Sequence, residues 1–300
     1  MNSHDNAGLP AMAQALEQSG DYRVLRRLVP RQVCVDRESN VPIKTGILID
    51  VETTGLDTKA DEVIELGMVK FGYLTDGTIT HVIGRFGAFN EPEKPIPAEV
   101  VALTRITNEM VVGHSIDIAT VSDFIADANI IIAHNANFDR RFAERYWPDF
   151  EHKPWACSAN EIDWRSHGFE GSRLSYLLMG AGLFHAAHRA VDDCDALLEV
   201  LAMPLGHSGK PAFAFLLDRA RRDTFRVWAE GAPFELKDEL KRRGYRWNDG
   251  SDGRPRSWHI EIAEAELEDE IAHLSRHIYR REVEPYVQPL SALVRFSSRS

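Results

Sequence analysis

Short apolar runs alternate with polar, turn-forming segments through the middle of the chain. The run Gly46–Val51 is almost wholly apolar and leads into acidic residues, which is typical of a buried strand. The runs Val63–Tyr73 and Ile79–Phe86 are rich in β-formers and flank the turn signal Thr75-Asp76-Gly77. Together these runs predict a three-stranded antiparallel meander.

Helical patterns and a further strand follow the meander. Asp117–Ala128 has helical spacing, and Asn129–Ala133 has the pattern of another buried strand. Two more helices are expected, from about Ala136 to Trp147 and from about Ala190 to Met203. Strands first, then alternating helix and strand, predict a mixed α/β sheet flanked by helices.

The same patterns divide the chain into four parts. These are a helical extension at 1–44, the α/β domain at 45–205, a linker at 206–211 and a small α+β unit at 212–300. In the extension, Ala11–Leu16 and Tyr22–Val29 are compatible with helices. In the last unit, an amphipathic helix is expected to end at Gly244, before two strands that carry Trp247 and Trp258.

Composition places the chain among ordinary globular proteins. Of its 300 residues 44% are hydrophobic and 27% charged, and no apolar run approaches the ~20 residues that span a bilayer. The first twenty residues lack the basic segment of a secretory signal. Three cysteines, Cys34, Cys157 and Cys194, are too few for a disulfide framework, so a reducing, cytoplasmic location without membrane association is expected.

The charge is unevenly distributed. The whole chain has a net charge of −11, but residues 1–206 alone carry 18 basic and 30 acidic residues, a net charge of −12. Residues 219–256 carry 11 basic and 7 acidic residues, a net charge of +4. An acidic front part either repels polyanions or receives them through metal cations.

A first cluster of acids follows the first predicted strand. Asp50 and Glu52 are two residues apart, so on a strand their carboxylates point to the same face. Two adjacent carboxylates are costly unless one is protonated or a cation lies between them. The pair therefore indicates a divalent metal site, and a solvated strand end is the alternative.

Two further clusters lie where the chain enters helices. Asp139 falls in the first turn of the helix after Asn129–Ala133, where the helix dipole favours a carboxylate, although Asn135 or Asp139 could simply cap that helix. His188 lies five residues before Asp193, which allows the histidine to come from a loop and the aspartate from a helix. A structural or surface histidine is the alternative.

The three clusters together resemble the motifs of the DEDDh family of 3′→5′ exonucleases. DxETTGL, HNAxFD and HxAxxD occur here in the same order and with the same internal spacing, over roughly 45–205. The chain looks like a member of the DnaQ-like group, which includes the proofreading epsilon subunit of bacterial DNA polymerase III. The resemblance implies a ribonuclease H-like fold with a mixed five-stranded sheet whose first three strands are antiparallel.

The resemblance also implies roles for single residues. The metal-binding carboxylates match Asp50, Glu52, Asp139 and Asp193, and the catalytic histidine matches His188. Four carboxylates can hold two divalent ions, for which Mg²⁺ is expected and Mn²⁺ would substitute. His188 would accept a proton from the attacking water.

Substrate contacts are expected beside the acids. Thr53 and Leu56 directly follow the first pair, and Asn135 and Phe138 belong to the second motif, where Phe138 is also expected to pack in the core. The segment Leu103–Thr107 (LTRIT) resembles the family's LTGIT segment, with Arg105 where glycine is usual.

The resulting prediction is a metal-dependent nuclease that acts on nucleic acid with a free 3′ end. It would release nucleoside monophosphates from DNA, preferentially single-stranded, in proofreading, repair or end trimming. Two alternatives stay open: the same chemistry on RNA, and a non-catalytic module that binds nucleic acid or a polymerase.

The C-terminal unit has no predicted catalytic residues. Its basic stretch and its tryptophans predict either a surface that holds the substrate or one that binds a protein partner, such as a DNA polymerase. Gln288–Leu293 resembles the short glutamine-plus-hydrophobic peptides that dock on sliding clamps, and an ordinary terminal strand is the alternative.

Overall fold

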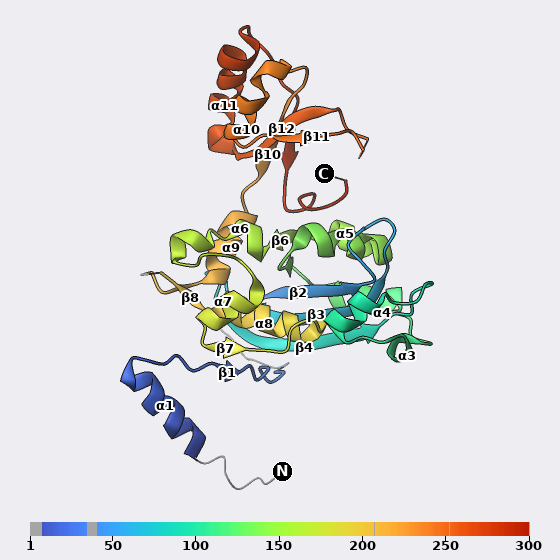
Figure 1. Ribbon diagram of the computed structural model, residues 1–300, viewed down its shortest axis with the longest axis vertical. Helices are drawn as coiled ribbons and strands as arrows, with labels where there is room; N and C mark the ends of the chain where they lie inside the picture. The colour runs from blue at the N-terminus through green and yellow to red at the C-terminus, as the bar shows by residue number, and fades with distance from the viewer. Residues whose placement is uncertain (1–7, 35–40, 207, 252, 300) are drawn as a thin grey trace. The chain divides into compact units, whose positions relative to one another are not determined.

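The computed structural model describes residues 8–34, 41–206, 208–251 and 253–299, which form two compact units (Figure 1). The first unit includes the chain up to residue 217 together with 296–298, and the second includes 218–295. Parts of the predicted extension (1–7 and 35–40), one linker residue (207) and one residue of the turn before Trp258 (252) lie outside the described residues. None of the described helices has the length and apolar character needed to cross a membrane.

The described part of the first unit contains nine strands and a set of helices. Its strands are β1 (Arg26–Arg27), β2 (Lys44–Thr53), β3 (Val63–Tyr73), β4 (Ile79–Phe89), β5 (Ile130–Ala133), β6 (Trp155–Cys157), β7 (Leu183–Phe184), β8 (Pro204–Leu205) and β9 (Lys210–Pro211). Its helices are α1 (Leu9–Ser19), α2 (Ala98–Thr104), α3 (Asn108–Val111), α4 (Ile118–Ile125), α5 (Ala136–Tyr146), η2 (Pro148–His152), α6 (Ser158–Glu161), η3 (Trp164–His167), α7 (Leu174–Gly180), α8 (Ala190–Ala202) and α9 (Ala212–Ala220), the last of which runs across the division at residue 217.

The main sheet has five strands in the order β4-β3-β2-β5-β6. Strands β2, β3 and β4 pair antiparallel, whereas β5 pairs parallel with β2 and β6 parallel with β5. This arrangement confirms the predicted mixed five-stranded sheet with an antiparallel start. The register places Asp50 opposite Gly67 and Glu52 opposite Glu65.

Each face of the sheet is covered by helices. Ile49 and Val51 of β2 join one core with Phe142 of α5 and Ile125 of α4. Helix α8 packs on β2, β3 and β4. Because side chains alternate along a strand, Asp50 and Glu52 point away from the α4–α5 core and toward α8.

The tryptophans of this unit belong to the core. Trp147 and Trp155 are 1% and 0% exposed. Trp155 opens β6, a strand of three residues that the sequence pattern did not locate. Its indole N–H donates to the carbonyl of Phe150 at 3.1 Å, so the buried donor is satisfied.

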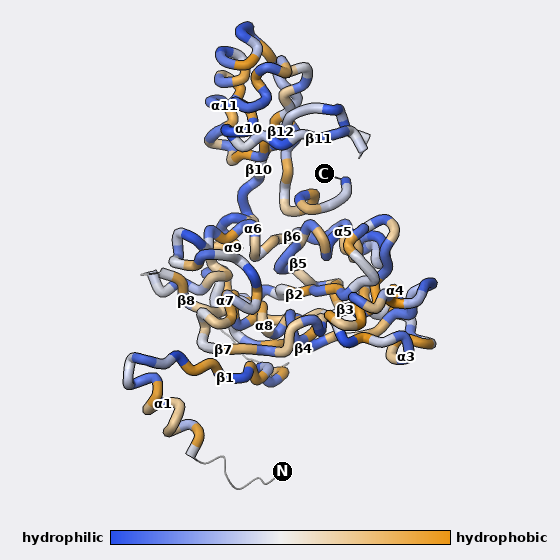
Figure 2. The backbone as a smooth tube through the Cα atoms, viewed as in Figure 1, coloured by the Kyte–Doolittle hydropathy of each residue, from blue (hydrophilic) through white to orange (hydrophobic). Residues whose placement is uncertain are grey.

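The N-terminal segment is helical only in part. Ala11–Leu16 lies in α1, which has both hydrophobic and hydrophilic positions (Figure 2). The helix predicted at Tyr22–Val29 is wrong, because this segment is extended and contains β1. The Arg26 and Leu28 amides donate to the carbonyls of Gly182 and Phe184, so pairing with a distant segment replaces the hydrogen bonds of a helix.

The segment predicted as a linker, 206–211, forms part of a two-stranded hairpin. Strands β8 and β9 pair antiparallel across it, and the compact units divide after residue 217. Phe213 explains the difference, since its ring packs against Phe71 and Tyr73 of β3 at centroid distances of 5.5 and 5.0 Å. The start of α9 therefore belongs to the first unit, while the functional division at 206–211 stays a prediction.

The second unit is a four-stranded antiparallel sheet with helices against one face. Its strands lie in the order β11-β12-β10-β13. Val227 and Ala229 of the sheet share a core with Leu240, Leu274 and Ile278 of the helical segments. The elements are β10 (Thr224–Ala229), η4 (Phe234–Leu236), α10 (Lys237–Arg242), β11 (Arg246–Asn248), β12 (Ser257–Ala263), η5 (Glu264–Glu266), α11 (Leu267–His273), the π-helical η6 (Leu274–Tyr279) and β13 (Val287–Leu290).

Two predictions for this unit have clear outcomes. The helix ends before Gly244, whose φ of +99° is the left-handed conformation that glycine tolerates. The segment Gln288–Leu293 is not a free tail, because β13 pairs with β10 and Leu290 is 1% exposed. The alternative of an ordinary terminal strand is therefore correct for its first half.

Candidate active site

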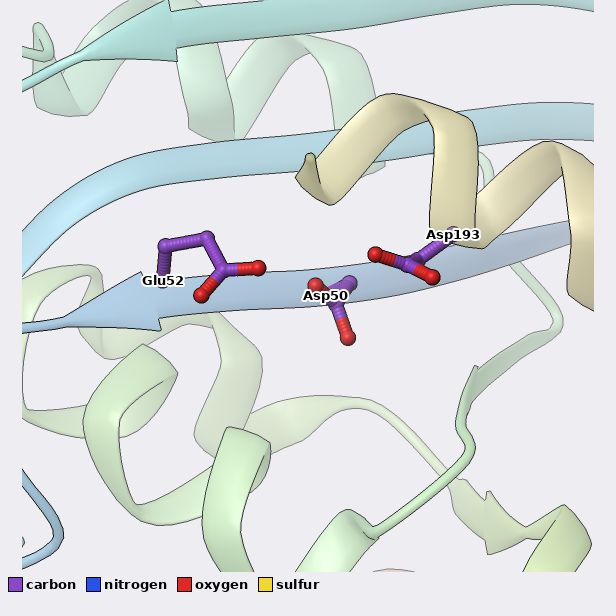
Figure 3. A group of neighbouring side chains, drawn as sticks. All are labelled: Asp50, Glu52 and Asp193. Carbon is purple, nitrogen blue, oxygen red and sulfur yellow. The ribbon is translucent and has the colours of Figure 1, made fainter. Parts of the chain in front are cut away.

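Three carboxylates converge beside the end of β2. Asp50 and Glu52 come from the strand and Asp193 from the first turn of α8, and the three side chains gather around one space (Figure 3). One oxygen from each lies within 4.8 Å of the others. The strand period thus predicted the first pair correctly, and the fold adds a residue from a distant part of the sequence.

The fourth predicted carboxylate lines the same pocket. Asp139 lies in the first turn of α5, is 3% exposed, and accepts a hydrogen bond from the Val51 amide at 3.2 Å. This bond ties the carboxylate to the backbone between Asp50 and Glu52. The pocket has a volume of about 250 Å³, and its lining residues are Asp50, Val51, Glu52, His134, Asn135, Phe138, Asp139, Leu174, His188 and Asp193.

The carboxylates hold protons more tightly than free acids do. Burial, followed by repulsion from Asp139 and then Asp193, raises the pKa of Asp50 well above its ordinary value. Burial and the neighbouring acids raise the pKa of Glu52 to about 8. Burial also raises the pKa of Asp139 to about 7, against the effect of its backbone hydrogen bonds.

This chemistry fits a divalent cation. The convergent atoms are all carboxylate oxygens, the ligands that hard cations such as Mg²⁺ prefer. The raised pKa values of Asp50 and Glu52 show that nearby positive charge does not balance the cluster, although Arg189 partly lowers the pKa of Glu52. A bound cation would supply the missing charge.

Asp193 is oriented by partners on both of its oxygens. His185 Nε2 lies 2.6 Å from Oδ1, and the amides of His188 and Arg189 donate to Oδ2 at 2.8 and 3.2 Å. No sequence motif assigned His185 a role, since its spacing from Asp193 matches none of the three clusters. Only the course of the loop before α8 brings its ring to the carboxylate.

His188 occupies the rim of the pocket. It is exposed and lines the pocket with the four acids. Its φ of +70° lies in the left-handed region, which is uncommon for a residue with a side chain. The structure therefore places the predicted proton acceptor beside the carboxylates, and its role stays a prediction.

An ion pair with a buried glutamate anchors the loop that carries His188. Glu65, 4% exposed, accepts from Arg189 Nη2 at 2.8 Å and from the amide of Ala190 at 3.1 Å. The sequence pattern did not indicate this pair, although Glu65 lies on a strand that the pattern located. The pair holds the start of α8 against β3.

A glycine permits this close approach. A Cβ added to Gly67 would lie 2.3 Å from the carbonyl carbon of Ala190, a backbone atom that cannot move aside. Gly67 is the register partner of Asp50, so the helix that carries Asp193 sits directly over the strands that carry the other acids.

Of the four predicted substrate residues, two line the pocket and two are not among its lining residues. Asn135 and Phe138 line the pocket, and Phe138 also packs against Phe142 with ring centroids 5.0 Å apart. Asn135 precedes α5, but its side chain makes no capping hydrogen bond, so the alternative that Asn135 simply caps this helix is not supported. Thr53 is buried and donates to the Gly55 carbonyl at 2.6 Å, whereas Leu56 is 84% exposed.

Arg105 stands where the resembling motif has glycine. It follows α2 with a φ of +61°, the left-handed conformation that glycine adopts without cost. The backbone of the LTRIT segment therefore keeps the form that glycine favours, while the exposed arginine adds a cation.

Comparison with known proteins agrees with this geometry. The family described as "Exonuclease" (RNase_T) matches residues 47–201. The chain is 32% identical over 172 residues to the DNA polymerase III subunit epsilon of Treponema pallidum (strain Nichols), covering 54% of this chain and 76% of that protein. It is 30% identical over 179 residues to the PolC-type DNA polymerase III of Thermotoga petrophila, covering 54% of this chain but 12% of that protein.

Among solved structures, exonuclease X in complex with 5′ overhanging duplex DNA aligns over 56% of this chain and 99% of its own. Its TM-score of 0.41 and 22% identity are too low to support an inference about substrate. The family match covers more than half of the chain and contains all four acids and His188. The chain therefore belongs to the exonuclease family, which confirms the prediction of a nuclease that hydrolyses phosphodiester bonds.

Proposed function

We propose that this protein is a metal-dependent 3′→5′ exonuclease of the DEDDh type that acts on DNA. The observation that carries the proposal is the convergence of oxygens from Asp50, Glu52 and Asp193 within 4.8 Å, with the pKa of Asp50 and Glu52 raised. The reaction would cleave the terminal phosphodiester of a strand and release a nucleoside monophosphate. Proofreading, repair or end trimming would use this activity.

Asp50, Glu52, Asp139 and Asp193 would hold two divalent ions, Mg²⁺ or in its place Mn²⁺. When bound, such ions lower the pKa of water and stabilise charge on the attacking and leaving oxygens. The chain itself fixes the carboxylates, since the Val51 amide holds Asp139, and the amides before α8 hold Asp193.

His188 would accept the proton of the attacking water. Histidine is the side chain best suited to exchange protons near neutral pH. Its position on the pocket rim, outside the group of convergent carboxylate oxygens, supports a role in proton transfer rather than metal binding.

The strand end would lie against the apolar side chains beside the acids. Leu56 is exposed just beyond β2, and Phe138 lines the pocket, so both are available to contact the terminal base and sugar. The similarity to a DNA polymerase III subunit supports DNA as the substrate and a polymerase as a partner. A strand with an unpaired 3′ end is the preferred form in this proposal.

The test is a degradation assay with the full chain. Single-stranded DNA, duplex DNA and RNA, each labelled at the 5′ or the 3′ end, are incubated with Mg²⁺, Mn²⁺ or EDTA. We expect 5′-labelled single-stranded DNA to shorten stepwise, 3′-labelled strands to lose their label at once, and EDTA or Asp50→Ala to abolish both. Activity retained in EDTA, or a ladder that starts at the 5′ end, would overturn the proposal, and faster loss of RNA would favour the alternative substrate.

A further inference from the structure

The second unit exposes a tryptophan on an edge strand. Trp247 lies in β11, at one end of the strand order, and is 50% exposed. The hairpin that β11 forms with β12 is visible at the side of this unit in Figure 1. A half-exposed indole is unusual on a protein surface, because tryptophan is strongly buried on average.

The Trp247 indole packs against a neighbouring ring. Trp247 pairs across the strands with Trp258, and the rings lie edge to face with centroids 5.5 Å apart. Lys241 Nζ lies 5.9 Å from the Trp258 ring. Trp247 is thus packed against one ring while half of its surface is exposed, and this contact reduces the entropy lost when a flat ligand stacks on it.

Exposed cations lie on both sides of this edge strand: Lys241 approaches Trp258, whereas Arg246, the neighbour of Trp247 in β11, points to the opposite face. Lys241, Arg242, Arg246 and Arg256 are all exposed, and none forms an ion pair with another residue of the described chain. By contrast, Arg243 is paired with the buried Glu270 at 2.8 Å. The positive charge beside Trp247 is therefore available to a ligand.

The opposite face of the same strands is also cationic. Burial, then Arg226, and also Arg246 and Arg254 lower the pKa of His259 to about 4, with Glu261 opposing them. The Arg226 Nη1 and His259 Nδ1 atoms are buried without a hydrogen-bond partner in the described chain. On this face Arg226 is paired with Glu261 at 2.5 Å, so Arg246 is the exposed cation that it adds to the edge strand.

We propose that the surface formed by Trp247, Trp258, Lys241 and Arg256 binds single-stranded nucleic acid. A base would stack on the Trp247 indole, and the basic side chains would contact the flanking phosphates. Stacking on an aromatic ring combined with cationic contacts to the backbone is the general chemistry of sequence-independent single-strand binding. The proposal rests on the proposed function only in that both take a nucleic acid as the ligand.

This surface would complement the first unit. Residues 1–206 have a net charge of −12, so without metal that unit repels a polyanion. A second binding surface on the same chain raises the local concentration of the strand near the nuclease site when one strand can reach both. A nucleic-acid strand matches both features of the surface, because its phosphates complement the positive charge and its bases can stack on the exposed indole. An acidic protein partner would match the charge alone.

The test measures binding of fluorescent dT20 to the full chain by anisotropy, in EDTA so that cleavage does not contribute. We expect Trp247→Ala to weaken binding by about 5- to 150-fold and Trp247→Phe, which keeps an aromatic ring, to retain most of the affinity. The double change of Lys241 and Arg256 to alanine should lower the salt slope by about 1.4, because each phosphate that the protein no longer neutralises reduces the slope by ~0.7.

Tyr286 provides a matched control. It is a 59% exposed aromatic in the same unit, but Glu282 and Glu284 lie beside it, so Tyr286→Ala should leave binding unchanged. Circular dichroism of each variant separates unfolding from loss of binding. The proposal is overturned if wild-type protein does not bind dT20, or if Trp247→Ala and Tyr286→Ala behave alike. Since no cleavage is measured, failure here and failure of the exonuclease assay are distinguishable.

Discussion

Glu52→Gln tests whether the carboxylate cluster carries unbalanced negative charge. In the metal-free fold, burial and neighbouring acids raise the pKa of Glu52 from 4.5 to about 8. A carboxyl whose pKa is raised by folding binds more protons in the folded state, so its contribution to stability is full below about pH 4.5 and is lost as the pH rises through 8. The metal-free protein should therefore become less stable between pH 5 and pH 8.

The magnitude follows from the size of that pKa change. Each unit of difference corresponds to about 1.4 kcal/mol, so across three pH units Glu52 alone would lower the free energy of unfolding by about 3 kcal/mol. Glutamine has a similar shape and does not titrate. In EDTA, Glu52→Gln should match the wild type at pH 5 and exceed its stability by about 3 kcal/mol at pH 8.

The assay is urea unfolding of the full chain in EDTA at pH 5, 6, 7 and 8, followed by tryptophan fluorescence and circular dichroism. Glu99→Gln, an exposed position on α2, is the control and should keep the pH dependence of the wild type. Adding Mg²⁺ at pH 8 should stabilise the wild type more than Glu52→Gln. Wild-type stability that does not fall with pH, or an unchanged slope in Glu52→Gln, would refute the reasoning.

Three further predictions concern the site and its support. His188→Ala should lower kcat on single-stranded DNA by about 10²–10⁴-fold with little change in Mg²⁺ affinity by calorimetry, and a loss of affinity would show that the imidazole acts through the metal. Gly67→Ala would place a Cβ 2.3 Å from the backbone of α8, so unfolding free energy should fall by about 2 kcal/mol and kcat should drop, whereas Gly171→Ala, with no atom within 4 Å, should change neither. Asp195→Ala removes the buried carboxylate that accepts hydrogen bonds from Arg85 at 2.7 and 2.9 Å. The free energy of unfolding in urea should therefore fall by about 2 kcal/mol, and a fall of less than about 0.5 kcal/mol would contradict a structural role for this ion pair.

Much of the central fold could be predicted because its signals are local. Val63–Tyr73 is strand β3 with the same bounds, since the segment is rich in β-formers and ends just before the turn signal Thr75-Asp76-Gly77. Strand β6 has three residues and is defined by parallel pairing with β5, which no local pattern reports. Tyr22–Val29 was predicted wrongly for the same reason, because a distant strand supplies its hydrogen bonds.

The same distinction between local and distant signals applies to the site. Asp50 and Glu52 could be placed side by side from the strand period alone. The roles of His185 and Glu65 depend on where the loop before α8 runs, which is decided by packing against β3. Motif spacing therefore located the groups proposed to bind metal, but it could not locate the groups that hold them in position.

The left-handed backbone of His188 has a consequence for how this protein could be altered. For an L-amino acid with a side chain, a φ of +70° costs roughly 1 kcal/mol, and glycine adopts it without that cost. Replacing His188 with glycine would therefore remove this backbone strain, and the same replacement would delete the imidazole. A stabilisation programme guided by backbone geometry alone would choose glycine here and would remove the proposed proton acceptor, so thermal stability and turnover would move in opposite directions at this position.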